Sequence, residues 1–327
     1  MLGDDIEVWE AVAGDLRGIL RGLRDHKDGP IAAPVHYRLA VMRLQRGLIE
    51  DQEAVRKALG PDHADITLSG LDEHLRRQLD DDPEALPVLG ALRPAVRAEA
   101  MLQLHEAMQC DAELTPGLRA ATALASVSGR WSEAVAWLER LAVAEPAERA
   151  VRPLMTLAEV QWRKLGQPDQ ARRYLLEARA LSNEDPAVLD KLLKLDLDIS
   201  NWTEAVATCS ALIRQLGTAP EGRTLRVTYL LTLGEIHVYG LQKPAEALMH
   251  YLEALNSMPD YALTYTLVRE LLEANPWPSV AHDLPSVPEA QRAPVQRLID
   301  LLLEGAKHHA QDAEALVTGL RRALLGT

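Results

Sequence analysis

An alanine-led pattern recurs along the middle of the chain. It starts at Ala100, Ala134, Ala171, Ala205 and Ala247, which are 34, 37, 34 and 42 residues apart. In each copy, the residues four and seven positions later lie on the same helix face as the alanine. The small alanine lets a second helix approach closely, and the larger residues fill the space beside the contact. A period between about 20 and 50 residues predicts an array of repeated helix pairs.

Two longer segments that precede these alanines match each other. Ala158 begins the stretch AEVQWRKLGQPDQA, and Gly234 begins the stretch GEIHVYGLQKPAEA. Each has a small residue, then Glu, then Val or Ile, with a Leu and a Pro at equal offsets. Helical amphipathicity alone does not produce a match of this length. A proline after the last turn, such as Pro146 or Pro259, predicts that the chain reverses there and the next helix begins.

At these residues the chain resembles the tetratricopeptide repeat (TPR) family, whose unit is a helix-turn-helix of about 34 residues. The resemblance implies an all-α fold, a right-handed superhelical solenoid of antiparallel helix pairs. The unit around Gly234 and Ala247 fits best, since Tyr251 supplies the family's aromatic residue. Other units depart from the family pattern, with Leu138, Leu175 or Cys209 in place of the aromatic residue and Thr122 at the small position of the unit before Ala134.

The chain is predicted to have three parts. Residues 1–81 form an N-terminal helical region, which is either a set of degenerate repeats, the reading we favour slightly, or a small bundle. Its first helix starts near Ile6, and further helices are expected at about 34–59, 64–79 and, across the boundary, 83–110. Residues 82–275 form the repeat array, in which the loop 217–222 explains the 42-residue interval. Residues 276–327 are expected to form a C-terminal helical cap.

Charge and composition narrow the classes of partner. The chain of 327 residues has a net charge of −13, and residues 1–114 contribute −9, from 22 acidic and 13 basic residues. It therefore lacks the basic footprint of nucleic-acid binders, which we exclude on this ground. The acidic run Asp80 to Asp82 is expected to be a solvated loop that leads into a helix at Pro83. Apolar residues make up 47% and charged residues 25%, as in ordinary folded proteins.

The N-terminal sequence and the two cysteines predict a cytoplasmic protein. The start MLGDDIEVWEAV has acidic residues where a signal peptide has basic ones, and no run approaches 18 apolar residues. We therefore expect no membrane insertion. Cys110 and Cys209 do not form a pair at metal or redox spacing, and Cys209 occupies a packing position of the repeat.

No catalytic constellation is present in the sequence. The phosphate-binding GxxxxGK[ST], the GxSxG nucleophile turn and the HExxH zinc motif are all missing. His308, His309 and Asp312 have a spacing that could hold a metal weakly, but a solvated helix face explains them better. His237 and His250 are interpreted as surface or packing histidines. We therefore expect no enzymatic activity, no cofactor and no metal.

The TPR resemblance implies that the first helices of successive pairs line a groove that binds a partner protein or peptide. The alternating charges predict a partner of mixed charge, with Trp162 and Tyr239 as apolar anchors unless Trp162 only fills a junction between repeats. This favours a non-enzymatic scaffold or adaptor. The alternative is a regulator in which a peptide or ligand in the groove shifts residues 1–81. The groove candidates are Arg119, Arg152, Glu159, Trp162, Arg163, Asp190, Lys194, Asp198, Glu235 and Tyr239.

Overall fold

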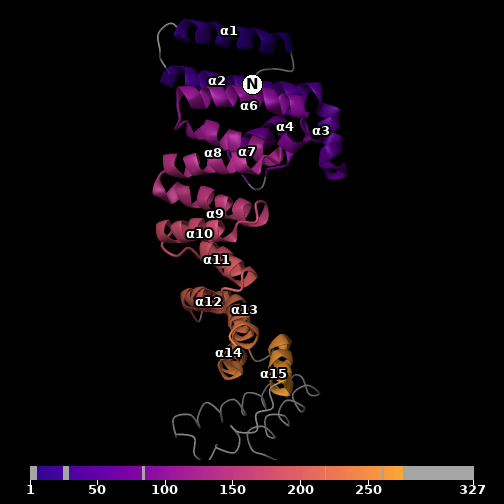
Figure 1. Cartoon of the computed structure of the whole chain (residues 1–327). Helices are drawn as coiled ribbons and strands as arrows, with labels where there is room; N and C mark the ends of the chain where they lie inside the picture. The colour runs from indigo at the N-terminus through magenta and orange to yellow at the C-terminus, as the bar shows by residue number, and fades with distance from the viewer. Residues whose placement is uncertain (1–5, 25–28, 83–84, 218, 259–260, 275–327) are drawn as a thin grey trace, which may run out of the picture. The chain divides into compact units, whose positions relative to one another are not determined.

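The computed structural model describes residues 6–24, 29–82, 85–217, 219–258 and 261–274. Within these ranges the chain is helical and has no strand, and the all-α TPR-like fold class is confirmed (Figure 1). The predicted cap at 276–327 lies outside the described residues. The helices are α1 (Ile6–Arg24), α2 (Gly29–Glu50), α3 (Gln52–Leu59), α4 (Leu68–Leu79), α5 (Val88–Ala91), α6 (Pro94–Cys110), α7 (Thr115–Val127), α8 (Trp131–Ala144), α9 (Ala147–Arg163), α10 (Pro168–Leu181), α11 (Pro186–Asp198), α12 (Trp202–Leu216), α13 (Arg223–Glu235), α14 (Pro244–Ser257) and α15 (Ala262–Ala274).

The N-terminal helices differ from the prediction at two places. The helix expected over 34–59 is divided into α2 and α3, because Asp51 leaves the helical conformation with φ −117° and ψ 21°. The helix expected over 83–110 is divided into α5 and α6. A residue that precedes proline is disfavoured in the helical conformation, and Arg93, which precedes Pro94, is extended. Pro94 then supplies the first residue of α6.

The alanine register is confirmed. Ala100, Ala134, Ala171, Ala205 and Ala247 are completely buried, and each lies in the second helix of a predicted pair. The second helices α8, α10, α12 and α14 pack against their preceding first helices α7, α9, α11 and α13. Full burial of so small a residue is what close helix contact requires.

One turn conformation connects the two helices of each pair. A residue with positive φ stands in every turn: Gly129, Gly166, Ser200 and Gln242, with values between 54° and 69°. In the two segments that match in sequence, the amide after this residue reaches back to the helix, from Gln167 to Gln161 O at 2.8 Å and from Lys243 to His237 O at 2.7 Å. The repeat is therefore one of backbone geometry as well as of side chains.

The small residue of the first helix lies against the second helix. Gly234 faces Tyr251 so closely that a β-carbon at this position would overlap the ring. Ala158 is the matching residue one pair upstream, and it is also buried. In the unit before Ala134, the residue at the same offset is Ala121, which is fully buried. The assignment of Thr122 to the small position was wrong by one residue.

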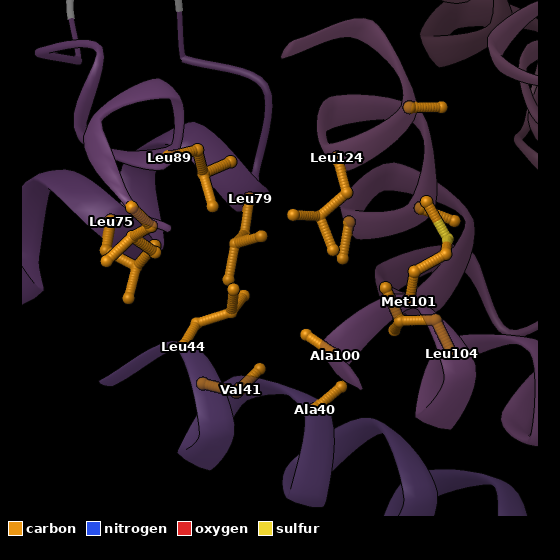
Figure 2. Packing of buried hydrophobic residues seen from close by; sticks show 14 of the residues in the cluster. Ala40, Val41, Leu44, Leu75, Leu79, Leu89, Ala100, Met101, Leu104 and Leu124 are labelled. Carbon is orange, nitrogen blue, oxygen red and sulfur yellow. The ribbon is translucent and has the colours of Figure 1, made fainter. Parts of the chain in front are cut away.

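The chain divides into two compact units, residues 1–183 and 184–327, and each is described by itself. In the first unit, α2 lies beside α6, and one hydrophobic cluster joins them to α4 and α7 (Figure 2). Leu44, Leu75, Leu104 and Leu124 belong to this cluster and are fully buried. The core of the first unit therefore continues across residue 82, where a domain boundary was predicted.

Two hydrophobic clusters lie in the described part of the second unit. One joins α11 to α12 and α13 around Cys209 and Leu212, and the other joins α13 to α14 and α15 around Tyr251. The end of α13 continues as a π-helical segment, Ile236–Gly240, closed by the hydrogen bond from Leu241 N to Ile236 O at 3.0 Å. A close contact accompanies this widened turn, since a β-carbon at Gly240 would overlap the Trp202 ring.

Candidate partner-binding surface

The solvent face of α9 contains three of the predicted groove residues. Arg152, Glu159 and Arg163 are exposed, and their spacing of seven and four residues places them on one helix face. The Arg163 guanidinium lies 3.5 Å from the centre of the Trp162 ring, a cation–π contact. The opposite face of α9 is buried and includes Leu157. This helix thus separates a packing face from a charged and aromatic face.

Three further candidates lie on α11 at intervals of four residues. Lys194 Nζ is 2.5 Å from Asp190 Oδ2, and Asp198 is exposed one turn further along the same face. The Tyr229 hydroxyl of α13 donates a hydrogen bond to Asp190 Oδ1 at 3.1 Å. Burial raises the pKa of Tyr229 to about 12, and the Asp190 charge acts in the same direction. Asp190 is therefore held in place by both a lysine and a tyrosine.

The last two candidates are four residues apart at the end of the first helix of the best-matching pair. Tyr239 is 67% exposed, although its body is apolar. Glu235 is exposed one turn earlier, yet partial burial of its carboxyl group raises its pKa. The neighbouring Ile236 and His237 are buried. The π-helical segment thus begins just after Glu235 and contains the exposed Tyr239.

Arg119 and Arg152 are bound to acidic residues of the chain itself. Arg119 forms an ion pair with Glu145, whose side chain is only 3% exposed. Arg152 Nε lies 3.0 Å from Asp81 Oδ2. Partial burial raises the pKa of Asp81 despite the opposing effects of Arg152 and Arg119. Both arginines therefore already have an acidic partner within the first unit, which the sequence did not suggest.

The acidic run after α4 is more than a solvated loop. Asp81 pairs with Arg152, and Asp82 Oδ2 accepts a hydrogen bond from Arg77 Nε at 2.6 Å. The acidic run is visible in the sequence, but its partner is not, because no local pattern joins residue 81 to residue 152. Glu145 likewise has no signal in the sequence that would link it to Arg119.

The ten candidates fall into two sets, one in each compact unit. In the first unit, the Arg163 guanidinium lies over the Trp162 ring. Arg119 and Arg152 are both close enough to Asp81 for their charges to act on the pKa of its carboxyl group. In the second unit, it brings together Asp190 and Lys194. Glu159, Asp198, Glu235 and Tyr239 lie on the exposed faces just described. Whether these ten residues bind a partner stays a prediction.

Two histidines of the second unit, His237 and His250, form a stacked pair. The rings of His237 and His250 lie 5.0 Å apart, and His237 Nδ1 is 3.0 Å from Glu246 Oε2. Burial lowers the pKa of both imidazoles. In the described part of the chain, no three His, Cys, Asp or Glu side chains are arranged to hold a metal ion. The spacing noted at 308–312 lies outside that part.

Within the described ranges, no helix combines the length and apolar character needed to cross a lipid bilayer.

No protein-family profile matches the sequence, and no curated protein matches it. Similar solved structures include YrrB, a TPR protein with an unusual peptide-binding site, at 19% identity and a TM-score of 0.40, covering 66% of this chain and 97% of YrrB. PilF of Pseudomonas aeruginosa has 18% identity and a TM-score of 0.35, covering 74% of this chain and 98% of PilF. Human IFIT1, solved as a dimer with PPP-AAAA, has 14% identity and a TM-score of 0.38, covering 98% of this chain and 69% of IFIT1.

Proposed function

We propose that this protein is a non-enzymatic scaffold or adaptor that binds a segment of a partner protein. Each compact unit has its own candidate surface: the exposed face of α9 in the first unit, and the exposed faces of α11 and of the end of α13 in the second. One observation carries the proposal: these first helices bury one face against their alanine-bearing partners and keep charged and aromatic side chains on the other. Tyr239 is 67% exposed although its ring is apolar, and an exposed aromatic side chain of this kind is typical of an interface anchor.

The exposed faces favour a partner segment of mixed charge with apolar anchors. On α11, Asp190 and Lys194 present both signs of charge within one turn. On α9, Trp162 and the stacked Arg163 offer a flat apolar surface edged by a cation. Aromatic and arginine side chains contribute much of the free energy of binding in protein interfaces. The preference for a protein partner over nucleic acid rests on the acidic net charge of the chain.

The test is capture of partners from the cell of origin followed by crosslinking, with the full chain as bait. Tyr239→Ala is expected to weaken recovery of the main partner about tenfold or more. Met249→Ala is the matched control, since Met249 is also exposed and apolar but lies on a second helix. Crosslinks should map to α9, α11 or α13. Equal recovery with both variants and crosslinks elsewhere would refute the proposed surface.

A second candidate function is regulation, and the ion pair between Asp81 and Arg152 favours it. This pair joins the end of the α4 region to the exposed face of α9. A partner that engages Arg152 would compete with Asp81 and so affect residues 1–81. Both side chains of the pair are about half exposed, and such pairs contribute little stability, so competition is easy.

Hydrogen exchange distinguishes the two functions. With a captured partner peptide bound, protection confined to α9, α11 and α13 supports the adaptor. Changed protection in α2 to α4, abolished by Asp81→Asn, supports the regulator. An Asp80→Asn variant controls for the loss of one acidic charge in the same run. A catalytic function would require turnover that a single substitution in the surface abolishes.

A further inference from the structure

A hollow of about 390 Å³ lies between α1, α2 and α6 of the first unit, and none of the ten partner-binding candidates lines it. Each helix contributes one face to it. On α1 the lining residues are spaced by three and four positions, from Glu10 to Arg17. On α2 the four lining residues between Leu39 and Arg46 also share one helix face. The volume is within the range of about 300 to 1,000 Å³ that is usual for small-molecule sites.

One end of the hollow is closed by ion pairs. Arg46 Nη1 lies 3.0 Å from Glu10 Oε1, which ties α2 to α1. Arg43 pairs with Glu99, which ties α2 to α6. Both carboxylates that line the hollow are thereby matched with an arginine. At this end the arginines and the carboxylates already pair with one another, so a charged ligand has no unpaired group to bind.

The other end has hydrogen-bond donors without acceptors. Arg17 lines the hollow two turns after Glu10, and no other described residue forms an ion pair or a hydrogen bond with it. Gln103 lines the hollow from α6, and its Oε1 is 3.1 Å from His36 Nδ1, so its carbonyl oxygen is occupied and its amide nitrogen is left as a donor. A guanidinium and an amide N–H both donate hydrogen bonds, so a ligand group that only accepts them is complementary to this pair.

The part of the hollow near this end is apolar. Leu39 and Met42 are buried residues of α2 that form its wall, and Leu102 of α6 stands at its rim, 61% exposed. The lining of the hollow thus offers a ligand both apolar contacts and, at Arg17, a positive charge. Small-molecule sites usually combine apolar walls with a few placed polar groups in this way.

We propose that the hollow binds a small amphiphilic carboxylate. Its carboxylate accepts hydrogen bonds from Arg17 and Gln103, and its hydrocarbon part covers Leu39, Met42 and Leu102. Arginine is suited to this role because its planar guanidinium donates two parallel hydrogen bonds to a carboxylate. Arg43 and Arg46 already pair with carboxylates of the chain, Glu50 among them, so Arg17 is the arginine of the hollow that a ligand with a single negative charge would meet. This binding site is separate from the adaptor function proposed above.

The experiment is calorimetric titration of the full chain with octanoate below its micelle concentration. We expect saturable binding of one molecule per chain. Octan-1-ol, which keeps the hydrocarbon and lacks the charge, and acetate, which keeps the charge and lacks the hydrocarbon, should each bind about tenfold or more weakly. Equal binding of octan-1-ol would overturn the assignment of the carboxylate to Arg17.

Two variants locate the site. Arg17→Gln is expected to weaken octanoate binding about tenfold or more. Arg21→Gln is the matched control, since Arg21 is exposed one turn later on α1, has no described partner and does not line the hollow. Arg17 is itself exposed, so both variants should fold, which circular dichroism checks. Absence of saturable octanoate binding, or equal losses in the two variants, would overturn the proposal.

Discussion

The contact between Gly234 and Tyr251 leads to a quantitative prediction about the best-matching repeat. A β-carbon at Gly234 would overlap Tyr251 Cε1 and would lie 2.7 Å from both Cδ1 and Cζ. Tyr251 is 2% exposed, so the ring has no open space into which it can turn. Gly234→Ala should therefore destabilise the second unit, although alanine is the better helix former.

The magnitude follows from two opposing effects. Replacing a glycine inside a helix by alanine gains about 1 kcal/mol from backbone entropy. Forcing an extra group into a packed contact costs about 1 to 3 kcal/mol, and the rigid ring places this case at the upper end. The expected net loss is about 1 to 2 kcal/mol. Gly18→Ala, at an α1 position with no heavy atom within 4 Å of the added β-carbon, should show only the gain.

A double-mutant cycle separates the clash from general damage. The pair upstream already combines Ala158 with Leu175 at the equivalent positions, and both are buried. Gly234→Ala together with Tyr251→Leu should copy that arrangement. Tyr251→Leu alone leaves a void and is destabilising. In the double variant the two losses should not add, and the coupling free energy should be about 1 to 2 kcal/mol in favour of the pair.

The assay is urea unfolding of the four proteins, combined with hydrogen exchange of α13 and α14 to assign the change to the second unit. The reasoning would be refuted by strictly additive losses, or by a Gly234→Ala variant as stabilised as Gly18→Ala. Either result would mean that the two helices can separate slightly at no cost, so that the small residue does not determine their distance.

Three further predictions concern single sites. Ala171→Leu should cost about 1 to 3 kcal/mol in urea unfolding by overpacking a fully buried contact, whereas Glu235→Ala on the exposed face should cost little; a neutral Ala171→Leu would contradict the assigned register. Burial lowers the pKa of His237 and His250, so the unfolded chain binds more protons below the ordinary imidazole pKa of about 6.5. Their contribution to stability is complete above that pH and is lost as the pH falls toward the lowered pKa values. Urea midpoints should therefore decline between pH 7 and pH 5.5, and the decline should be smaller in His250→Gln. Equal declines in the two proteins would show that this histidine pair is not the cause. Burial raises the pKa of the Cys209 thiol to about 12, so iodoacetamide should modify it only after unfolding, and labelling of the native protein would contradict its placement.

Much of the array could be predicted because its signal is local and repeated. The alanines and the residues four positions later, such as Leu175 and Tyr251, lie on one face of each helix. The periodicity of 3.6 residues allows that face to be recognised in the sequence. The helix breaks at Asp51 and before Pro94 could not be predicted in the same way. Helix boundaries depend on a few residues and on what packs beside them.

The sequence by itself determined the helical repeat, the residues that bury its contacts and the absence of recognisable catalytic motifs. The tertiary structure alone decided that Asp81 reaches Arg152, that the core of the first unit crosses residue 82, and that Arg17 faces a hollow between three helices. The reason is physical. Periodicity records which face of a helix is buried, whereas an ion pair or a cavity depends on the spatial proximity of segments that are far apart in the chain, and no local pattern encodes it.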